Sequence, residues 1–285
     1  MSKDGREGWH GWDDYAAFYD WENARTVGRR DIAFWQRLVE DHGGPVLELG
    51  CGSGRVLVPV ARSGESVVGL DRSDNMLALA QRRVRRAKLG ACVRLVRGDI
   101  RALPFSTQHR FSLVIAPYGV LQSLLRDRDL RRTLVSVRDA LRPGGLFAVD
   151  LVPDLPGWEE SERRVSLRGR RPGGQARITL IESVRQDRAR GLTIFDQEFI
   201  ERRGRQRTVH EFSLTFRTLS VPQMVGRLRR AGFRLERLAD HHRSSDRNSR
   251  WSSYQDPRKS KCLNWNFPLL KRKGQRDIWP AQWYL

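Results

Sequence analysis

A glycine-rich turn is the segment of this sequence whose residue types point most directly to ligand binding. Residues 48–54 read E-x-G-x-G-x-G and follow a short apolar run. Glycines such as Gly50 and Gly52 let the backbone approach a ligand that lies over the end of a strand. A dinucleotide fingerprint requires G-x-G-x-x-G, and Arg55 stands at the position of its third glycine. The spacing therefore favours a nucleoside ligand without a pyrophosphate group.

Two aspartates follow the turn at positions that suit the same ligand. Asp71 ends the second apolar run, where a carboxylate can accept hydrogen bonds from both hydroxyls of a ribose. Asp99 follows the third apolar run, where a carboxylate can accept an adenine amino group while Ile100 packs against the ring. The plainer interpretations are helix capping for the first acid and an ordinary loop acid for the second. Because Ser73 and Asp74 are better placed to cap, we favour ligand binding.

No arrangement of side chains marks a catalytic group, so the catalytic residues stay unassigned. Tyr118 or His210 could act as a base, but neither belongs to a His–Asp pair or a carboxylate dyad, and Tyr118 equally suits packing at a pocket rim. Cys51 lies in the glycine turn without a partner that would activate it as a nucleophile. His241 and His242 lack further ligands at a fixed spacing, so we expect no metal site.

The elements that must position these residues alternate between strand and helix over residues 26–157. Their apolar runs are continuous, which is typical of parallel strands buried between two layers of helices. We therefore predict a doubly wound, Rossmann-like α/β sheet. The expected strands are 46–49, 66–70, 93–97, 111–116 and 146–151, and the expected helices are 26–42, 55–63, 75–89 and 127–141.

The hydrophobic pattern changes from residue 158 onward, where apolar and polar residues alternate. This alternation is typical of antiparallel strands with one solvent-exposed face. We predict an antiparallel β insert over 158–219 that lies over the active edge of the main sheet. Residues 220–239 then return to the core as a last helix and strand. The expected strands of the insert are 163–170, 175–185, 192–202 and 206–219.

These residues, taken in order, resemble the class I S-adenosylmethionine-dependent methyltransferases over residues 28–238. Besides the glycine turn and the two aspartates, the resemblance covers Pro104-Phe105, Ala116-Pro117-Tyr118 and Leu141-Arg-Pro-Gly-Gly. It implies a seven-stranded sheet whose last strand is antiparallel. It also implies an enzyme that transfers a methyl group from S-adenosylmethionine to an acceptor by in-line displacement, with residues 26–157 as the cofactor-binding core.

The resemblance further implies which residues hold the cofactor. The expected contacts are Glu48, Gly50 and Gly52 at the methionine part, Asp71 at the ribose, Asp99 and Ile100 at the adenine, and the backbone of Ala116 near the amino acid moiety. Cys51 and Arg72, which adjoin these residues in the sequence, complete the expected cofactor-binding set.

The N-terminal segment, residues 1–25, contains a stretch similar to the lid of small-molecule methyltransferases. This stretch reads Tyr15-Ala-Ala-Phe-Tyr-Asp20, and Tyr19 is its best candidate for a contact with the cofactor. The alternative is an amphipathic helix that packs Tyr15, Phe18 and Tyr19 as core, and the sequence supports both interpretations equally.

The charge of the chain raises the question of a nucleic-acid partner. Of 53 basic residues only six are lysine, against 33 acidic residues, which leaves a net charge of +20. The arginines are scattered through every segment without interleaved aromatics, as a coding bias would also produce. The sequence Ile115-Ala-Pro-Tyr-Gly lacks the polar residue and the second proline typical of nucleic-acid amino-methyltransferases. We therefore expect a small-molecule acceptor, with RNA or another anionic polymer as the alternative acceptor.

The broad class of the protein follows from what the sequence lacks. It has no apolar run near the ~20 residues that a membrane span requires, and residues 1–12 have no signal-peptide core. Three cysteines do not make a disulfide framework. We therefore expect a folded cytoplasmic protein with no membrane partner, while the acceptor and the oligomeric state stay open.

The tail, residues 240–285, departs from the pattern of the family. It holds four of the six lysines and four of the nine tryptophans, and it has no helical or strand period. We expect no clear seventh strand there, with 279–285 as the one weak candidate. Our hypothesis is a change of reading frame near 238–240, and the alternative is a genuine tail that docks as an unusual cap. A damaged end would also fit an inactive cofactor-binding protein.

Overall fold

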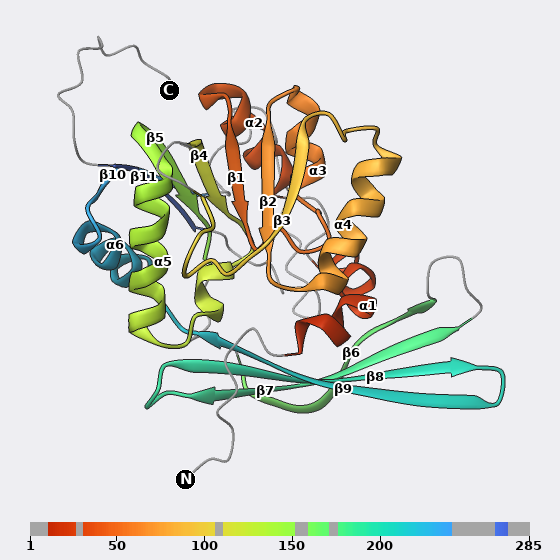
Figure 1. Cartoon of the computed structure of the whole chain (residues 1–285). Helices are drawn as coiled ribbons and strands as arrows, with labels where there is room; N and C mark the ends of the chain where they lie inside the picture. The colour runs from red at the N-terminus through yellow and green to blue at the C-terminus, as the bar shows by residue number, and fades with distance from the viewer. Residues whose placement is uncertain are drawn as a thin grey trace, which may run out of the picture.

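The strands of the protein form two sheets within the part of the chain that the computed structural model describes, residues 11–26, 31–105, 111–151, 159–170, 176–240 and 266–272. The main sheet contains β1 Val46–Leu49, β2 Val67–Asp71, β3 Val93–Arg97, β4 Phe111–Ala116, β5 Leu141–Val149, β10 Phe233–Asp240 and β11 Asn266–Arg272. Its order is β10-β11-β5-β4-β1-β2-β3 (Figure 1). The predicted doubly wound α/β class with a separate antiparallel sheet is confirmed.

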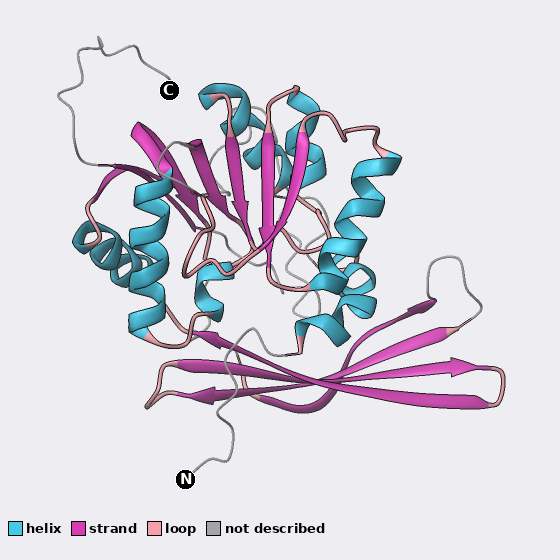
Figure 2. Cartoon of the chain, in the orientation of Figure 1, coloured by secondary structure: helices cyan, strands magenta, loops and turns pink. Residues whose placement is uncertain are grey.

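Both faces of the main sheet are buried, each by its own hydrophobic cluster. β4 shows the division, because Leu113 and Ile115 belong to one cluster whereas Val114 and Ala116 belong to the other. The helices on the first face are α2 Ile32–His42, α3 Leu57–Val60 and α4 Asp74–Arg86, and those on the second are α5 Asp127–Ala140 and α6 Val221–Arg230 (Figure 2). No helix in the described ranges is long and apolar enough to cross a membrane.

The seventh strand of the main sheet corrects our expectation for the tail. β11 lies between β10 and β5 and runs antiparallel to both, with Leu270 opposite Leu235 and Leu269 opposite Ala148. We expected no clear seventh strand in the tail, and its one weak candidate, 279–285, lies outside the described residues. The omission has a physical reason, since Pro268 interrupts the run and a proline argues against a strand paired on both edges. The change of reading frame stays a hypothesis.

The second sheet is an antiparallel meander whose inner face packs on the N-terminal helix. Its strands are β6 Ser161–Arg170, β7 Arg177–Asp187, β8 Leu192–Arg203 and β9 Gln206–Arg217. Alternate residues of β7 and β8 are buried, and Phe199 contacts the ring of Phe18 at 4.5 Å between centroids. Phe18 belongs to α1 Trp12–Asn23, which lies between this sheet and the carboxyl ends of β1 and β2 (Figure 1). Tyr15, Phe18 and Tyr19 are all buried, as expected of a helix that packs them as core, while the lid stays a prediction.

Candidate active site

A cavity of about 400 Å³ lies at the carboxyl ends of β1 to β4, bounded on the far side by α1 and β9. In the sheet order, β2 and β3 follow β1 on one side and β4 and β5 on the other. Ligands of open α/β sheets bind where the order reverses in this way. The residues that line the cavity are Gly11, Trp12, Asp13, Tyr19, Gly50, Gly52, Asp71, Arg72, Ser73, Met76, Arg97, Gly98, Asp99, Ile100, Pro117, Tyr118, Val120, Ser123, Leu124 and Phe216.

The glycine turn forms the floor of the cavity and requires its glycines. Gly50 and Gly52 have φ angles of 59° and 53°, in the left-handed region that favours glycine. A Cβ on Gly50 would overlap the side chain of Val120, whereas a Cβ on Gly52 would meet nothing closer than Tyr19 at 3.9 Å. The turn therefore leaves open space above its backbone.

Asp71 holds this turn in place and also lines the cavity. Its carboxylate accepts the backbone N–H of Gly52 at 2.8 Å and that of Ser73 at 2.9 Å, one at each oxygen. Burial raises the pKa of Asp71, and the backbone N–H groups of Ser73, Gly52 and Arg72 oppose that rise. Since a carboxylate oxygen has two lone pairs, each oxygen keeps the capacity to accept one further hydrogen bond.

Asp99 also lines the cavity, beside Ile100. Both of its oxygens are engaged by the guanidinium of Arg101, with Nε 3.0 Å from Oδ1 and a terminal nitrogen 2.7 Å from Oδ2. Arg72 lies farther away, 3.9 Å from Oδ2. The Arg101 hydrogen bond holds the pKa of Asp99 below its usual range, so this carboxyl is ionised at neutral pH.

Three residues of the expected cofactor site lie beneath the cavity instead of on its surface. Glu48 is 2% exposed, burial raises the pKa of its carboxyl well above the usual value, and its Oε2 has no hydrogen-bond partner within the described structure. Cys51 is buried with its Sγ toward Gly69 of β2. Ala116 is fully buried, and its carbonyl accepts the backbone N–H of Asp150. The cavity does bring together Tyr19, Gly50, Gly52, Asp71, Arg72, Asp99 and Ile100.

Helix α1 closes the cavity and is tied to both neighbouring segments of the core. The Asp13 carboxylate accepts a short hydrogen bond from the Ser73 hydroxyl at the start of α4. The Ser53 hydroxyl donates to Asp20 at 2.6 Å, which joins the helix to the glycine turn. Tyr19, which lies between Asp13 and Asp20 on the helix, lines the cavity. Burial raises its pKa to about 12, so its phenol is neutral.

A buried ion pair beside the cavity was not predicted from the sequence. Arg55 donates to both carboxylate oxygens of Asp31, at 2.6 and 2.8 Å, and its guanidinium lies 5.4 Å from the ring centre of Tyr118. The Asp31 side chain is fully buried and that of Arg55 is 12% exposed. The sequence interpretation used Arg55 only to exclude a dinucleotide-binding motif. Its position directly after the glycine turn was a signal that an acidic partner lies nearby.

The remaining end of the cavity is formed by the loop after β4, whose backbone is held by a buried acid. Tyr118 has a φ of 61°, which is uncommon for a non-glycine residue. Asp150 accepts the backbone N–H of Tyr118 at 2.7 Å and that of Gly119 at 2.6 Å. Burial raises the pKa of Asp150 to about 7. This acid was also missed, because a single aspartate at the end of a predicted strand has no distinguishing neighbour in the sequence.

The side chains at this end are mainly apolar or aromatic. They come from Tyr118, from the 3₁₀ turn η2 Val120–Ser123 with the following Leu124, and from Phe216 of β9. Of the two candidate bases, only Tyr118 reaches the cavity, and burial raises its pKa well above the usual value. His210 instead packs against Phe18, with ring centroids 4.8 Å apart.

Part of the chain that lines this cavity is similar to known proteins. Residues 46–145 match the family model described as "Methyltransferase domain". A curated relative, the glycine/sarcosine N-methyltransferase of Parasynechococcus marenigrum, is 31% identical over 139 residues, covering 48% of this chain and 48% of the relative. The chain thus spans about half the length of the curated relatives that it matches.

Two solved structures share the fold over most of the chain. The sugar N-methyltransferase KedS8 from Streptoalloteichus has a TM-score of 0.68 at 14% identity and covers 96% of both chains. An S-adenosylmethionine-dependent methyltransferase from Clostridium acetobutylicum has a TM-score of 0.65 at 15% identity, covering 90% of this chain and 98% of that one. At these identities the likeness shows the fold alone.

Proposed function

Because residues 46–145 match a methyltransferase family model, we propose that the protein transfers a methyl group from S-adenosylmethionine to a small-molecule acceptor. The observation that carries the proposal is the single cavity in which the glycine turn, Asp71 and Asp99 share one side while apolar and aromatic residues form the other. One side suits a nucleoside and the other suits an acceptor. The volume of about 400 Å³ lies within the range of small-molecule sites.

The chemistry of the lining residues fits the cofactor. Asp71 has acceptor capacity for the two ribose hydroxyls, and Asp99 is an ionised acceptor for the adenine amino group beside the apolar Ile100. Gly52 leaves space for the methionine part, because a Cβ there would meet nothing closer than Tyr19 at 3.9 Å. In this proposal Arg72 flanks the adenine end.

The buried members of the expected site would act indirectly. Glu48, Cys51 and Ala116 lie beneath the lining, so we assign them the support of the turn and of the β4 end instead of contacts by their side chains. Tyr19 would close the methionine end as part of α1, which makes residues 11–25 the proposed lid.

Methyl transfer would demand little from the side chains beyond alignment. When bound, the cofactor supplies a methyl group that its sulfonium already activates. Tyr118, Leu124 and Phe216 would hold the acceptor opposite that group, and α1 would exclude water. Alignment of this kind is worth about 7–11 kcal/mol of the barrier. Because burial keeps the Tyr118 phenol neutral, it would orient the acceptor by a hydrogen bond and would not serve as a base.

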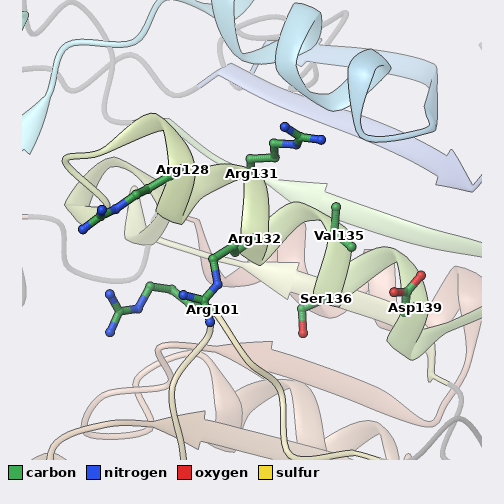
Figure 3. A pocket seen from close by; sticks show the side chains of 7 residues that line it. All are labelled: Arg101, Arg128, Arg131, Arg132, Val135, Ser136 and Asp139. Carbon is green, nitrogen blue, oxygen red and sulfur yellow. The ribbon is translucent and has the colours of Figure 1, made fainter.

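A second candidate function, methylation of an anionic polymer such as RNA, is favoured by one observation. The net charge is +20, and a hollow of about 520 Å³ between α5 and the loop after β3 is lined by Arg101, Arg128, Arg131 and Arg132 (Figure 3). Binding to single-stranded RNA that weakens steeply with added salt, together with methylated RNA as product, would favour this candidate.

Calorimetric titration with S-adenosylmethionine, followed by a methyl-transfer screen over metabolite extracts, tests the proposal. We expect binding and the transfer of labelled methyl groups to a metabolite in at least one extract fraction. Binding with no turnover on any pool would instead support an inactive cofactor-binding protein. The absence of any binding would contradict the proposal.

A further inference from the structure

Arg101 connects the proposed cofactor site to helix α5. It follows Asp99 by two residues and lines the arginine hollow, which we define as the space bounded by Arg101, Arg128, Arg131, Arg132, Val135, Ser136 and Asp139 (Figure 3). Although its own side chain lies outside the cavity, it contacts a carboxylate on each side, Asp99 in the cavity and Asp129 on α5. Arg101 therefore links Asp99, which lines the cavity, to helix α5 and can restrict the movement of its carboxylate.

The contact with Asp99 fixes the plane of that carboxylate. Arg101 donates from Nε to Oδ1 and from a terminal nitrogen to Oδ2, and its backbone N–H donates to Oδ1 at 2.9 Å. Two parallel bonds from a planar guanidinium set both the position and the orientation of a carboxylate. The Asp99 side chain is 34% exposed, so without this partner it would be free to rotate toward water.

The contact with Asp129 fixes the other side of the guanidinium. Asp129 lies in the first turn of α5 with a side chain only 3% exposed, and its Oδ1 is 3.5 Å from a terminal nitrogen of Arg101. Its Oδ2 is buried without a hydrogen-bond partner among the described residues. A buried carboxylate is costly unless a cation lies close, so Asp129 holds Arg101 against the helix.

We propose that Arg101 is a positioning residue that holds Asp99 in the orientation needed to accept the 6-amino group of the cofactor's adenine, and so determines the selectivity for that purine. The inference rests on the proposed function, because it assigns the adenine to Asp99. It adds a residue that touches neither cofactor nor acceptor but sets which nucleoside the site accepts.

A neighbouring arginine provides a matched control. Arg132 lines the same hollow from α5, and no carboxylate lies within ion-pair distance of it in the described structure. A substitution there removes the same charge from the same hollow while leaving Asp99 and its partner untouched. A general effect of charge would thus appear in both variants, and an effect on orientation only in the Arg101 variant.

The test compares two ligands by calorimetry, S-adenosylhomocysteine and its deaminated analogue, in which a ring carbonyl replaces the 6-amino group. A hydrogen bond to a charged acceptor implies that the natural protein prefers the amino form by about tenfold or more. We expect Arg101→Gln to reduce this preference to about threefold or less, Arg101→Lys to restore it in part because lysine lacks the fork, and Arg132→Gln to retain it in full.

A second variant distinguishes a general loss of folding from a loss of the Asp99 orientation. The double variant Arg101→Gln with Asp129→Asn removes the uncompensated buried charge, and we expect its preference to stay as low as that of Arg101→Gln. A preference that survives in either variant would overturn the inference while leaving the proposed function intact. If the natural protein binds neither ligand, the proposed function itself fails, and the inference with it.

Discussion

At the scale of single residues, Asp71 does two things with one carboxylate. It holds the glycine turn through Gly52 and the start of α4 through Ser73, and it keeps acceptor capacity toward the cavity. The side chain that we propose binds the ribose therefore also sets the position of the turn. A site built in this way is organised before any ligand arrives, which lowers the ordering cost of binding.

Replacement of this side chain should weaken the cofactor strongly. Asp71→Ala removes the acceptors for two ribose hydroxyls and also strands the N–H groups of Gly52 and Ser73. We expect the dissociation constant of S-adenosylmethionine to rise by more than about tenfold in calorimetry. Asp71→Asn, which keeps one acceptor oxygen and the shape, should show a smaller rise. An unchanged constant in Asp71→Ala would remove Asp71 from the site.

The buried ion pair of Arg55 and Asp31 bears on stability. Asp31 also accepts the indole N–H of Trp35, so its carboxylate accepts three hydrogen bonds in the interior. We expect Asp31→Asn to lower the free energy of unfolding by about 3–5 kcal/mol in urea titrations. The surface pair Arg138–Asp139 is the control, because Asp139→Asn should cost less than about 1 kcal/mol. Equal losses in the two variants would contradict the importance of the buried pair.

At the scale of elements, the loop after β4 depends on an acid from the end of β5. Asp150 holds two consecutive backbone N–H groups and so determines where Tyr118 enters the cavity. Its carboxyl is completely buried and has a pKa of about 7 in the folded protein against 3.8 ordinarily. The folded state thus binds this proton more tightly than the unfolded state does.

The contribution of Asp150 to stability should therefore fall as pH rises between its two pKa values. The folded state retains the proton over this interval while the unfolded chain releases it, so rising pH favours unfolding. Asp150→Asn cannot titrate, and the opposite contributions of Asp99 and Asp127 cancel in the comparison. Urea titrations should show the stability of the natural protein falling relative to the variant from about pH 4 to about pH 7. A difference that is flat, or that rises, would contradict this account.

The elements that the sequence predicted well are those defined by burial along a continuous run. The strands β1 and β4 begin and end at the predicted residues, because a strand buried on both faces needs mostly apolar side chains. The bounds of β3 were also predicted, although this edge strand is only partly buried. β11 was missed because its pairing comes from the backbone and its run contains a proline. Long-range polar pairs are absent from any local pattern, so Asp31 and Asp150 were missed.

At the scale of the whole molecule, the site lies between two sheets that the chain builds separately. The main sheet supplies the glycine turn and the two aspartates, and the antiparallel sheet supplies Phe216 and the surface on which α1 packs. Gln122, which is fully buried beside the cavity loop, donates to the carbonyl of Arg217 and joins the two sheets. The change of hydrophobic period at residue 158 predicted the separate antiparallel sheet, but the sequence could not show which of its side chains reach the cavity.

The cavity is the proposed nucleoside site, and a crystal structure with S-adenosylhomocysteine tests this most directly. We predict that both ribose hydroxyls donate to the Asp71 carboxylate, that the adenine lies against Ile100 with its amino group on Asp99, and that the thioether faces Tyr118. A crystal in which this compound is absent from the cavity at saturating concentration, or lies elsewhere on the protein, would contradict the account.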